Sequence, residues 1–333
     1  MNRRVLITGA TGFIGSHLTE LLVRSGDEVT CLRRKTSNLR WLKDLNVQYH
    51  TGEVTDKKSL RDAVRDKEII FHLASLTKAT DPRDYYRVNA QGARNLLEVC
   101  TRENPNIRRF ILVSSQAATG PSPSETPIDE TWPPEPVTDY GKSKLEAEKI
   151  AREFMESIPI TIVRPPAVYG PRDRYIYIQF KLISKIKKRG LIFSIGKQDQ
   201  LVSLVYAPDL AKAVNILSEC HKASGETYFV ANPEPYRWSR LCQEIAATLE
   251  KEIKRYIRLP LWLAELAAFC CEVKASLTKK ATILNRQKIR ELSQVYWVCS
   301  PGKLERDTGF VCPTTVSQGI QETAHWYREN GWL

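Results

Sequence analysis

The stretch Val5-Leu6-Ile7-Thr8-Gly9-Ala10-Thr11-Gly12-Phe13-Ile14-Gly15 decides the fold of this chain. It begins as an apolar run typical of a buried strand, continues through three spaced glycines, and enters a helical pattern near Phe13. Glycine permits a tight turn and a close approach of the backbone to a pyrophosphate, while the amides and the positive dipole end of the following helix attract the phosphate charge. An ordinary strand-to-helix turn is the alternative interpretation. The favoured one is a dinucleotide site, with cofactor contacts from Gly9, Thr11, Gly12, Phe13, Ile14 and Gly15.

Apolar runs and helical patterns alternate along the first half of the chain. Strands are expected at residues 5–8, 28–32, 47–50, 69–73, 110–114 and 161–164, and helices at 13–25, 57–65, 83–103, 139–156 and 208–219. This alternation predicts an α/β fold, a Rossmann-like doubly wound parallel sheet with ligands at the carboxyl ends of its strands. After about residue 165 the alternation fades into Pro-rich turns and a Trp-rich tail. We therefore expect a nucleotide-binding domain over 1–165 and a smaller substrate-binding domain over 166–333, partly interleaved because helix 208–219 should pack on the first.

The composition is that of an ordinary globular protein, with 42% hydrophobic residues in a chain of 333. Its eight cysteines are scattered without the spacing of a metal site or a disulfide framework, so we expect no metal, and reduced thiols in a cytoplasmic protein. The net charge of +12 is dispersed. Its densest run, residues 181–189, is typical of an amphipathic helix with a solvated basic face, so no nucleic-acid partner is expected.

One apolar stretch, residues 259–271, needs a separate explanation. It is interrupted by Glu265 and is too short to span a bilayer. The first apolar run of the chain leads straight into the glycine turn and does not have the form of a signal peptide. Three interpretations of 259–271 stay open: domain core, a wall for an apolar substrate, or a peripheral contact with a membrane surface.

The residue that closes the second strand selects between the two nicotinamide dinucleotides. A carboxylate there binds the ribose hydroxyls of NAD, whereas an arginine pairs with the additional phosphate of NADP. This chain has Arg33 followed by Arg34, which predicts NADP in preference to NAD; two surface residues of a basic protein are the alternative. After the third strand, Val54 and Asp56 are further candidate cofactor contacts, and Asp56 could equally cap the next helix.

Tyr140 and Lys144 are four residues apart in a stretch of strong helix formers, so both side chains fall on one helical face. A phenol with a pKa of about 10 is a poor base at neutral pH, and a neighbouring ammonium favours its phenolate. Lys144 can supply that charge and can also donate to a cofactor ribose. A solvent-exposed helix face is the alternative. The pattern predicts a tyrosine acid/base with lysine as its activator.

Ser114 and Ser115 follow the apolar run 110–113, at the carboxyl edge where ligands are expected. A serine hydroxyl there can hold a reacting oxygen while the tyrosine exchanges its proton. A turn or helix cap is the alternative for such a pair.

Six motifs, in this order, resemble the extended short-chain dehydrogenase/reductase superfamily, the NAD-dependent epimerase/dehydratase group. The similarity covers nearly the whole chain and is closest to members of the dihydroflavonol reductase and 3β-hydroxysteroid dehydrogenase type. The motifs are Thr8-Gly-Ala-Thr-Gly-Phe-Ile-Gly15, Phe71-His-Leu-Ala-Ser75, Val88-Asn-Ala-Gln-Gly92, Val113-Ser-Ser115, Tyr140-Gly-Lys-Ser-Lys144 and Arg164-Pro-Pro-Ala-Val-Tyr-Gly-Pro-Arg172.

The resemblance implies roles for single residues. Tyr140 would be the proton donor or acceptor, Lys144 its activator and ribose ligand, and Ser115, rather than Ser114, the partner of the substrate oxygen. It further implies a homodimer through helices 83–103 and 139–156. Other residues implied are Leu73 and Ala74 as backbone contacts of the cofactor, Asn89 as a structural or proton-relay residue, and Pro165 to Val168 beside the nicotinamide.

The substrate class is open between three hypotheses. The first is an NAD(P)-dependent oxidoreductase acting on a carbonyl or secondary alcohol of an apolar small molecule. The second is a nucleotide-sugar epimerase or dehydratase, and the third is a non-catalytic dinucleotide sensor or RNA-associated protein. Intact Ser115, Tyr140 and Lys144 disfavour the third.

One position separates the first two hypotheses. Many nucleotide-sugar members that this chain resembles carry a diphosphate-binding arginine where this chain has Val202. We therefore expect an apolar substrate, buried near Tyr169, Tyr206 and residues 259–269. Cations that could replace the missing arginine are Arg172, Arg174, Lys197 and Arg237.

Overall fold

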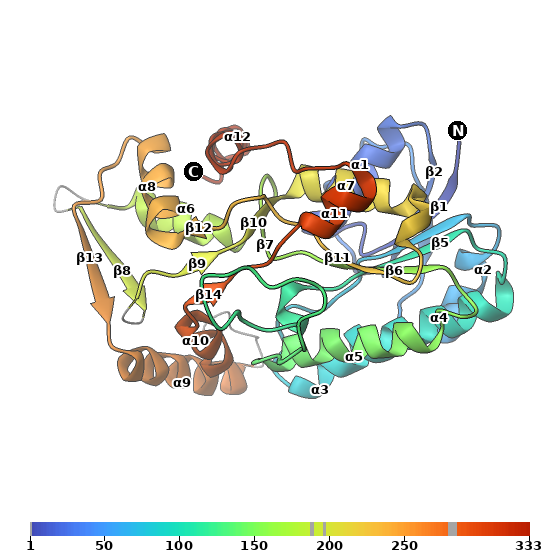
Figure 1. Cartoon of the computed structure of the whole chain (residues 1–333), viewed down its shortest axis with the longest axis horizontal. Helices are drawn as coiled ribbons and strands as arrows, with labels where there is room; N and C mark the ends of the chain where they lie inside the picture. Colours follow the sequence, from blue (N-terminus) through green and yellow to red (C-terminus); the bar gives the residue numbers. More distant parts are fainter. Residues whose placement is uncertain (1, 187–189, 196–197, 279–284) are drawn as a thin grey trace.

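A seven-stranded parallel sheet forms the centre of the molecule in the computed structural model, which describes residues 2–186, 190–195, 198–278 and 285–333 (Figure 1). The strand order is β3-β2-β1-β4-β5-β6-β11, and every neighbouring pair is parallel. The strands are β1 (Arg4–Thr8), β2 (Glu28–Arg33), β3 (Gln48–Thr51), β4 (Ile69–His72), β5 (Arg109–Val113), β6 (Ile160–Arg164) and β11 (Thr227–Phe229).

Both faces of this sheet are buried, because alternate residues along each strand enter different cores. Val5 and Ile7 of β1 belong to one core, under α1 (Phe13–Arg24) and α7 (Ala207–Glu219). Leu6 belongs to the other, over α4 (Gln91–Glu103) and α5 (Asp139–Glu153). Helices on both faces explain why the strands are continuous apolar runs, and they confirm the predicted doubly wound sheet.

The predicted elements match the observed ones with small shifts and two changes. The helix expected at 57–65 is a 3-10 turn, Lys57–Leu60, followed by α2 (Arg61–Val64). The helix expected at 83–103 is divided into α3 (Pro82–Tyr85), a π-helical turn (Tyr86–Ala90) and α4. The seventh strand, β11, has three residues and was not predicted.

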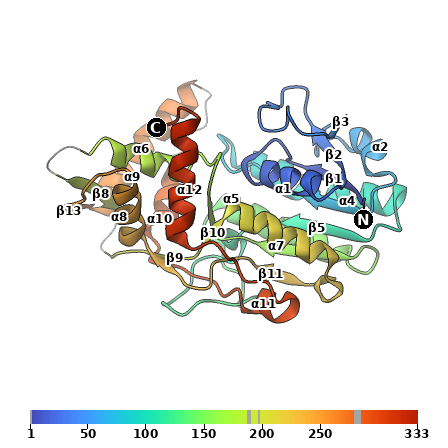
Figure 2. The same cartoon turned by 90° about the horizontal axis from the view of Figure 1, so that it is seen from above.

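The smaller region is built mainly from the second half of the chain. Figure 2 shows α6, α8 and α12 on one side of the molecule and α1 and α2 on the other. Its elements are β7 (Ala167–Tyr169), α6 (Ile176–Ser184), β8 (Leu191–Ile195), β9 (Leu201–Val202), β10 (Leu204–Tyr206), β12 (Tyr236–Arg237), α8 (Trp238–Thr248), β13 (Arg255–Leu259), α9 (Leu261–Thr278), α10 (Arg286–Ser293), β14 (Tyr296–Trp297) and α12 (Val316–Glu329). Two 3-10 turns, Gln116–Ala118 after β5 and His221–Ala223 after α7, belong with the large sheet.

Three elements from beyond residue 165 belong with the large sheet. β11 extends it beside β6, α7 packs against α1, and α11 (Gly302–Thr308) contacts β11 and contributes Leu304 to the core under α1 and α7. The chain therefore crosses between the two regions more than once. A boundary at residue 165 stays a prediction.

The basic helix predicted at 181–189 is displaced toward the N-terminus. α6 ends at Ser184 with Lys185 as its C-cap, and residues 187–189 lie outside the described part of the chain. Within that described part, no helix has the length and apolar character needed to cross a bilayer.

Candidate active site

The glycine turn leaves room for a phosphate at the start of α1. A Cβ on Gly9, whose φ is +74°, would lie 2.7 Å from the backbone nitrogen of Ala74, and a Cβ on Gly15 would lie 2.2 Å from the Gly9 carbonyl oxygen. A Cβ on Gly12 would meet only the Gly9 oxygen, at 3.1 Å. Gly12 is also the N-cap of α1 and gives its amides no side-chain partner. The turn therefore fits a dinucleotide pyrophosphate, with the amides of the first turn as donors.

A buried hydrogen-bond chain holds the segment after β4 against this turn. The Ala74 amide donates to Thr8 Oγ1 at 3.2 Å, and Thr8 Oγ1 lies 2.7 Å from Nδ1 of His72. Burial lowers the pKa of His72 to about 3, so its ring is neutral at physiological pH and shares a hydrogen bond with the threonine hydroxyl. Leu73 and Ala74 are thereby fixed beside Gly9, where the resemblance places the cofactor.

Arg33, at the end of β2, is available for an anionic ligand. Its guanidinium lies over the ring of Tyr49 at 5.6 Å, and its Nε is buried without a hydrogen-bond partner. Among the described residues, neither Arg33 nor Arg34 forms an ion pair with a carboxylate. This geometry fits the additional phosphate of NADP.

The two candidates after β3 have local roles. The Asp56 side chain accepts from the Lys58 amide at 3.0 Å, which is a helix cap. Val54 is buried, and a Cβ on Gly92 would lie 2.7 Å from its methyl group. Their contacts with a cofactor stay predictions.

Lys144 is buried and Tyr140 is half-buried on the side of α5 that faces the end of β5. The helix begins at the N-cap Thr138, whose hydroxyl accepts from the Gly141 amide at 3.1 Å. A Cβ on Gly141 would lie 2.2 Å from the Ala117 carbonyl oxygen, so glycine is what allows α5 to approach the turn after Ser115. Nζ of Lys144 donates to the Val113 carbonyl at 2.7 Å.

Burial shifts both titrating groups. It raises the pKa of Tyr140 to about 12, with the Glu291 charge acting in the same direction and hydrogen bonds to Ser115 and Ser75 opposing it. It lowers the pKa of Lys144 to about 8, against the opposing charge of Glu148. At neutral pH Tyr140 is therefore a protonated acid, and Lys144 is close to its own titration range.

The two serines after β5 are distinguished by their partners. Ser114 Oγ donates to Glu148 at 2.5 Å, and Glu148 also forms a buried ion pair with Arg164 at 2.6 Å. Ser115 Oγ accepts from the Ala117 amide at 3.1 Å, and Ser115 is close enough to Tyr140 to oppose the rise in the pKa of its hydroxyl. Ser115, not Ser114, is therefore placed to act together with the tyrosine.

Asn89 connects the loop after β4 to α5. It lies in the π-helical turn, donates to Ser143 Oγ at 2.9 Å, and accepts from the Leu76 amide at 2.7 Å and from Ser75 Oγ at 3.1 Å. These contacts give Asn89 a structural role. They also hold Ser75 near Tyr140. The sequence alone did not identify Ser75 as a site residue, although it follows β4 much as Ser115 follows β5.

Pro165 and Val168, predicted beside the nicotinamide, follow β6. The Pro165 carbonyl accepts from the Gln116 amide at 2.8 Å and so supports the turn after Ser115. Val168 pairs with Val205 between β7 and β10. Contact of either residue with a cofactor stays a prediction.

Two residues of α10 also reach this site from the far end of the chain. Gln287 Nε2 donates to Asp139 Oδ2 at 2.6 Å, and Gln287 Oε1 accepts from the Asp139 amide at 2.8 Å. Glu291, one turn later, is the residue whose charge acts on Tyr140. Neither could be found by sequence, because no local pattern connects residues almost 150 positions apart.

The predicted apolar pocket around Tyr169 and Tyr206 is wrong. Both rings are buried, and Tyr206 donates to Glu322 of α12 at 2.6 Å. A Cβ on Gly319 of α12 would lie 2.4 Å from the Tyr169 hydroxyl, so α12 covers both tyrosines. α9 lies on the other side of the molecule from α12 (Figure 1).

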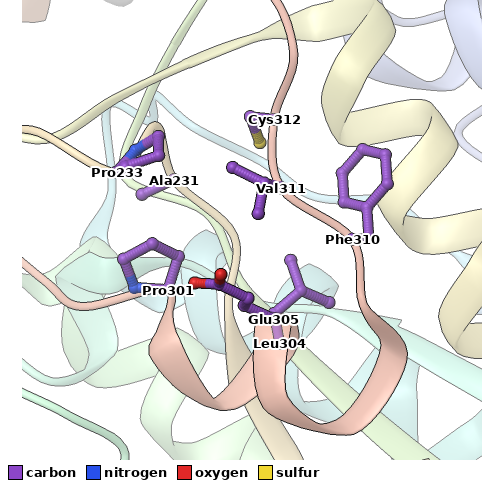
Figure 3. A pocket seen from close by; sticks show the side chains of 8 residues that line it. All are labelled: Ala231, Pro233, Pro301, Leu304, Glu305, Phe310, Val311 and Cys312. Carbon is purple, nitrogen blue, oxygen red and sulfur yellow. The ribbon is translucent and has the colours of Figure 1, made fainter.

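A small hollow beside α11 is separate from these residues. Its volume is about 10 Å³, roughly that of one water molecule, and none of the predicted catalytic or cofactor residues lines it. Figure 3 shows its wall, formed by Ala231, Pro233, Pro301, Leu304, Glu305, Phe310, Val311 and Cys312.

The fold and the site define a nucleotide-dependent oxidoreductase with a doubly wound sheet. The chain belongs to the NAD dependent epimerase/dehydratase family, whose model matches residues 5–231. It is 29% identical to a ceramide reductase of Caulobacter vibrioides over 329 residues, 99% of this chain and 96% of that protein.

Two further likenesses come from epimerases. An N-acetyl-alpha-D-glucosaminyl-diphospho-ditrans,octacis-undecaprenol 4-epimerase of Escherichia coli O157:H7 is 26% identical over 337 residues, 98% of this chain and 96% of that protein. The crystal structure of a UDP-glucose 4-epimerase from Thermotoga maritima has a TM-score of 0.79 at 20% identity and covers 98% of this chain and 99% of its own. The latter shows a shared fold.

Proposed function

We propose that this protein is an NADP-dependent reductase or dehydrogenase that moves a hydride between nicotinamide and a carbonyl or secondary-alcohol carbon of an apolar substrate. The observation that carries the proposal is the placement of Tyr140, next to Ser115 and beside the buried Lys144, at the carboxyl end of β5. Bound NADP(H) supplies or takes up the hydride.

The protein's own residues handle the proton. In the reducing direction Ser115 holds the substrate oxygen and the Tyr140 hydroxyl gives it a proton. A charged Lys144 then favours the phenolate that remains. The raised pKa of Tyr140, about 12, keeps that proton in place at neutral pH until the substrate oxygen becomes basic.

An apolar substrate class is proposed because position 202 lacks an arginine that could bind a diphosphate. Val202, where many nucleotide-sugar relatives carry an arginine, is buried in β9 between Tyr236 and Trp297. Of the possible replacements, Arg172 pairs with Glu20 and Arg237 with Glu125. Arg174 is exposed, and Lys197 lies outside the described residues.

The names of the relatives agree with an apolar substrate without deciding the reaction. The Caulobacter relative is a reductase named for a lipid, ceramide. The Escherichia relative is an epimerase, which makes epimerisation the second candidate.

A substrate screen tests the reaction class. NADPH oxidation is followed with ketones and aldehydes of increasing apolar area, beside UDP- and dTDP-sugars. We expect turnover of the apolar carbonyls, with affinity rising by about 25 cal/mol for each Å² buried. Competition by UDP or dTDP at low micromolar concentration, with NADP saturating, would instead support the epimerase.

Arg33→Asp tests the cofactor. The substitution removes a cation from the expected 2′-phosphate position and supplies a carboxylate for ribose hydroxyls, so we expect it to invert the preference for NADP over NAD. Calorimetric titration of both dinucleotides measures this directly. Equal affinities in the unmodified protein would contradict an NADP preference.

The proposal includes a homodimer through α4 and α5, which pack side by side on one face of the sheet. It also includes a cytoplasmic location, in keeping with eight unpaired cysteine thiols. Light scattering of the purified protein tests the first point.

A further inference from the structure

The helix α9 presents large apolar side chains to its surroundings. Trp262 is 64% exposed, Leu266 53%, Phe269 48% and Val273 45%. At about 100° of rotation per residue these four positions fall on one side of the helix, which we call the apolar face. Exposed apolar groups gathered in this way mark a binding surface rather than ordinary surface composition.

The opposite side of α9 is buried and carries only small residues. Ala264 and Ala268 pack against Ile289 of α10 and form a small core of their own. The helix is therefore turned so that its alanines face the protein. Domain core, one of the three interpretations of residues 259–271, is wrong for the large side chains.

Positive charge flanks this helix. Residues 258–291, from the end of β13 to α10, contain seven lysines and arginines against three glutamates, a net charge of +4. Arg258 is exposed just before α9, Arg290 is exposed on α10, and Arg286 is exposed and pairs with Glu272 of α9. An apolar face with basic residues around it and a tryptophan within it is typical of a helix that lies in the interface of a membrane.

A second copy of this chain or a lipid bilayer could cover the apolar face, and the charge around it distinguishes between these two occupants. In a two-fold contact with a second copy, the same patch would meet itself, so two regions of net charge +4 would be brought together. A bilayer containing anionic lipids offers an apolar interior and a negative surface at once. The charge therefore favours the lipid surface.

The position of α9 relative to the candidate active site is compatible with an anionic bilayer on its apolar face. Figure 1 shows α9 along one edge of the molecule, beside α10. α10 in turn contacts the start of α5 through Gln287 and Asp139, one residue before Tyr140. A bilayer against the apolar face would lie on the side of the molecule from which α10 approaches the site.

We propose that the apolar face of α9 and the basic residues around it bind this protein to the surface of an anionic lipid bilayer. This concerns lipid binding alone and does not depend on the proposed function. It is tested without substrate or cofactor.

Sedimentation with vesicles is the direct test. The full chain is mixed with phosphatidylcholine vesicles, with or without phosphatidylglycerol. We expect binding to the anionic vesicles at low salt, at least about tenfold weaker binding to the zwitterionic ones, and release in 1 M salt, where charges are screened beyond about 3 Å.

Paired variants assign that binding to α9. Trp262→Ser with Leu266→Ser and Phe269→Ser should weaken it at least about tenfold, because the buried apolar area is lost, whereas Leu182→Ser with Val311→Ser, on other exposed apolar residues, should not. Arg258→Glu with Arg290→Glu, on exposed cations that flank α9, should weaken it similarly through lost attraction. Lys43→Glu with Lys222→Glu makes the same change in net charge elsewhere and should have a smaller effect.

Three outcomes would overturn the proposal. The unmodified protein could fail to bind anionic vesicles at low salt. The variants of α9 and their controls could lose binding equally. The protein could also form a dimer that the triple serine variant dissociates, with no vesicle binding, and the apolar face would then be a contact between copies of this chain. Thermal unfolding by circular dichroism verifies that each variant is folded.

Discussion

The carboxyl end of β5 and the helix α9 both depart from the usual pattern in which polar side chains are exposed and apolar ones are buried. The first buries polar groups, and the second exposes apolar ones. Beside β5, Ser114, Lys144, Glu148 and Arg164 are buried polar groups, and each has a hydrogen-bond or ion-pair partner within the protein. On α9 the apolar face is exposed, and over residues 261–273, where burial is described, the buried side chains are Ala264 and Ala268.

The difference between the two regions lies in where the compensating partner is found. A buried charge destabilises the fold unless it is paired inside, so the region beside β5 is complete within one chain. An exposed apolar side chain destabilises the fold little. It gains favourable free energy only when another molecule covers it and removes it from water. Substitutions beside β5 should therefore alter activity or stability, and substitutions on the exposed apolar face of α9 should alter neither.

The largest effect is expected from Tyr140→Phe. The substitution removes the acidic proton and keeps the ring, so turnover on an identified substrate should fall by roughly 10² to 10⁴ while cofactor affinity changes little. Steady-state kinetics and calorimetry measure the two quantities. Tyr86→Phe, on an exposed tyrosine, is the matched control. Near-normal turnover in Tyr140→Phe would assign the acid/base role to another group.

Glu148→Gln is expected to have the next largest effect, on stability. It leaves the Arg164 guanidinium buried without its counter-charge, which should lower the free energy of unfolding by about 3–5 kcal/mol. Denaturant unfolding measures the loss. Glu153→Gln, on the exposed side of the same helix, should cost less than about 1 kcal/mol. Equal losses in the two variants would show that burial of the pair is unimportant.

The pH dependence should follow Lys144. Burial lowers its pKa to about 8, so the charged form is present below that pH and is lost above it. We expect kcat/KM for NADPH, which reports the free enzyme, to be level below about pH 8 and to fall about tenfold per pH unit above it. Because Glu148 raises this pKa, Glu148→Gln should move the fall to lower pH. A profile that stays level to about pH 10 would remove Lys144 from the proton chemistry.

The smallest effect is expected from Leu266→Ser. Its side chain is 53% exposed and contributes to no buried core, so the free energy of unfolding should change by no more than about 0.5 kcal/mol. Thermal or denaturant unfolding is the measurement. A loss of 2 kcal/mol or more, on the order of a buried leucine, would mean that the apolar face is covered within the chain itself.

Local patterns in the sequence were enough for the sheet and for the main site candidates. Apolar runs bounded by glycine and polar turns located six of the seven strands, and the spacing of Tyr140 and Lys144 placed them on one helical face. β11 was missed because three residues carry too little periodicity to distinguish a strand from a loop. The pocket expected at Tyr169 and Tyr206 failed because apolar composition does not say which element will cover it.

The sequence by itself determined most strands and helices up to residue 165, the glycine turn before α1 and the common helical face of Tyr140 and Lys144, because each rests on contacts between residues close in the chain. Only the tertiary structure decided that Ser115 rather than Ser114 meets Tyr140, since Glu148 and Arg164 engage the other serine. Folding likewise brought Gln287 to Asp139 and turned the alanines of α9 inward. These contacts depend on which distant segments pack together, and the local periodicity of the sequence does not predict that packing.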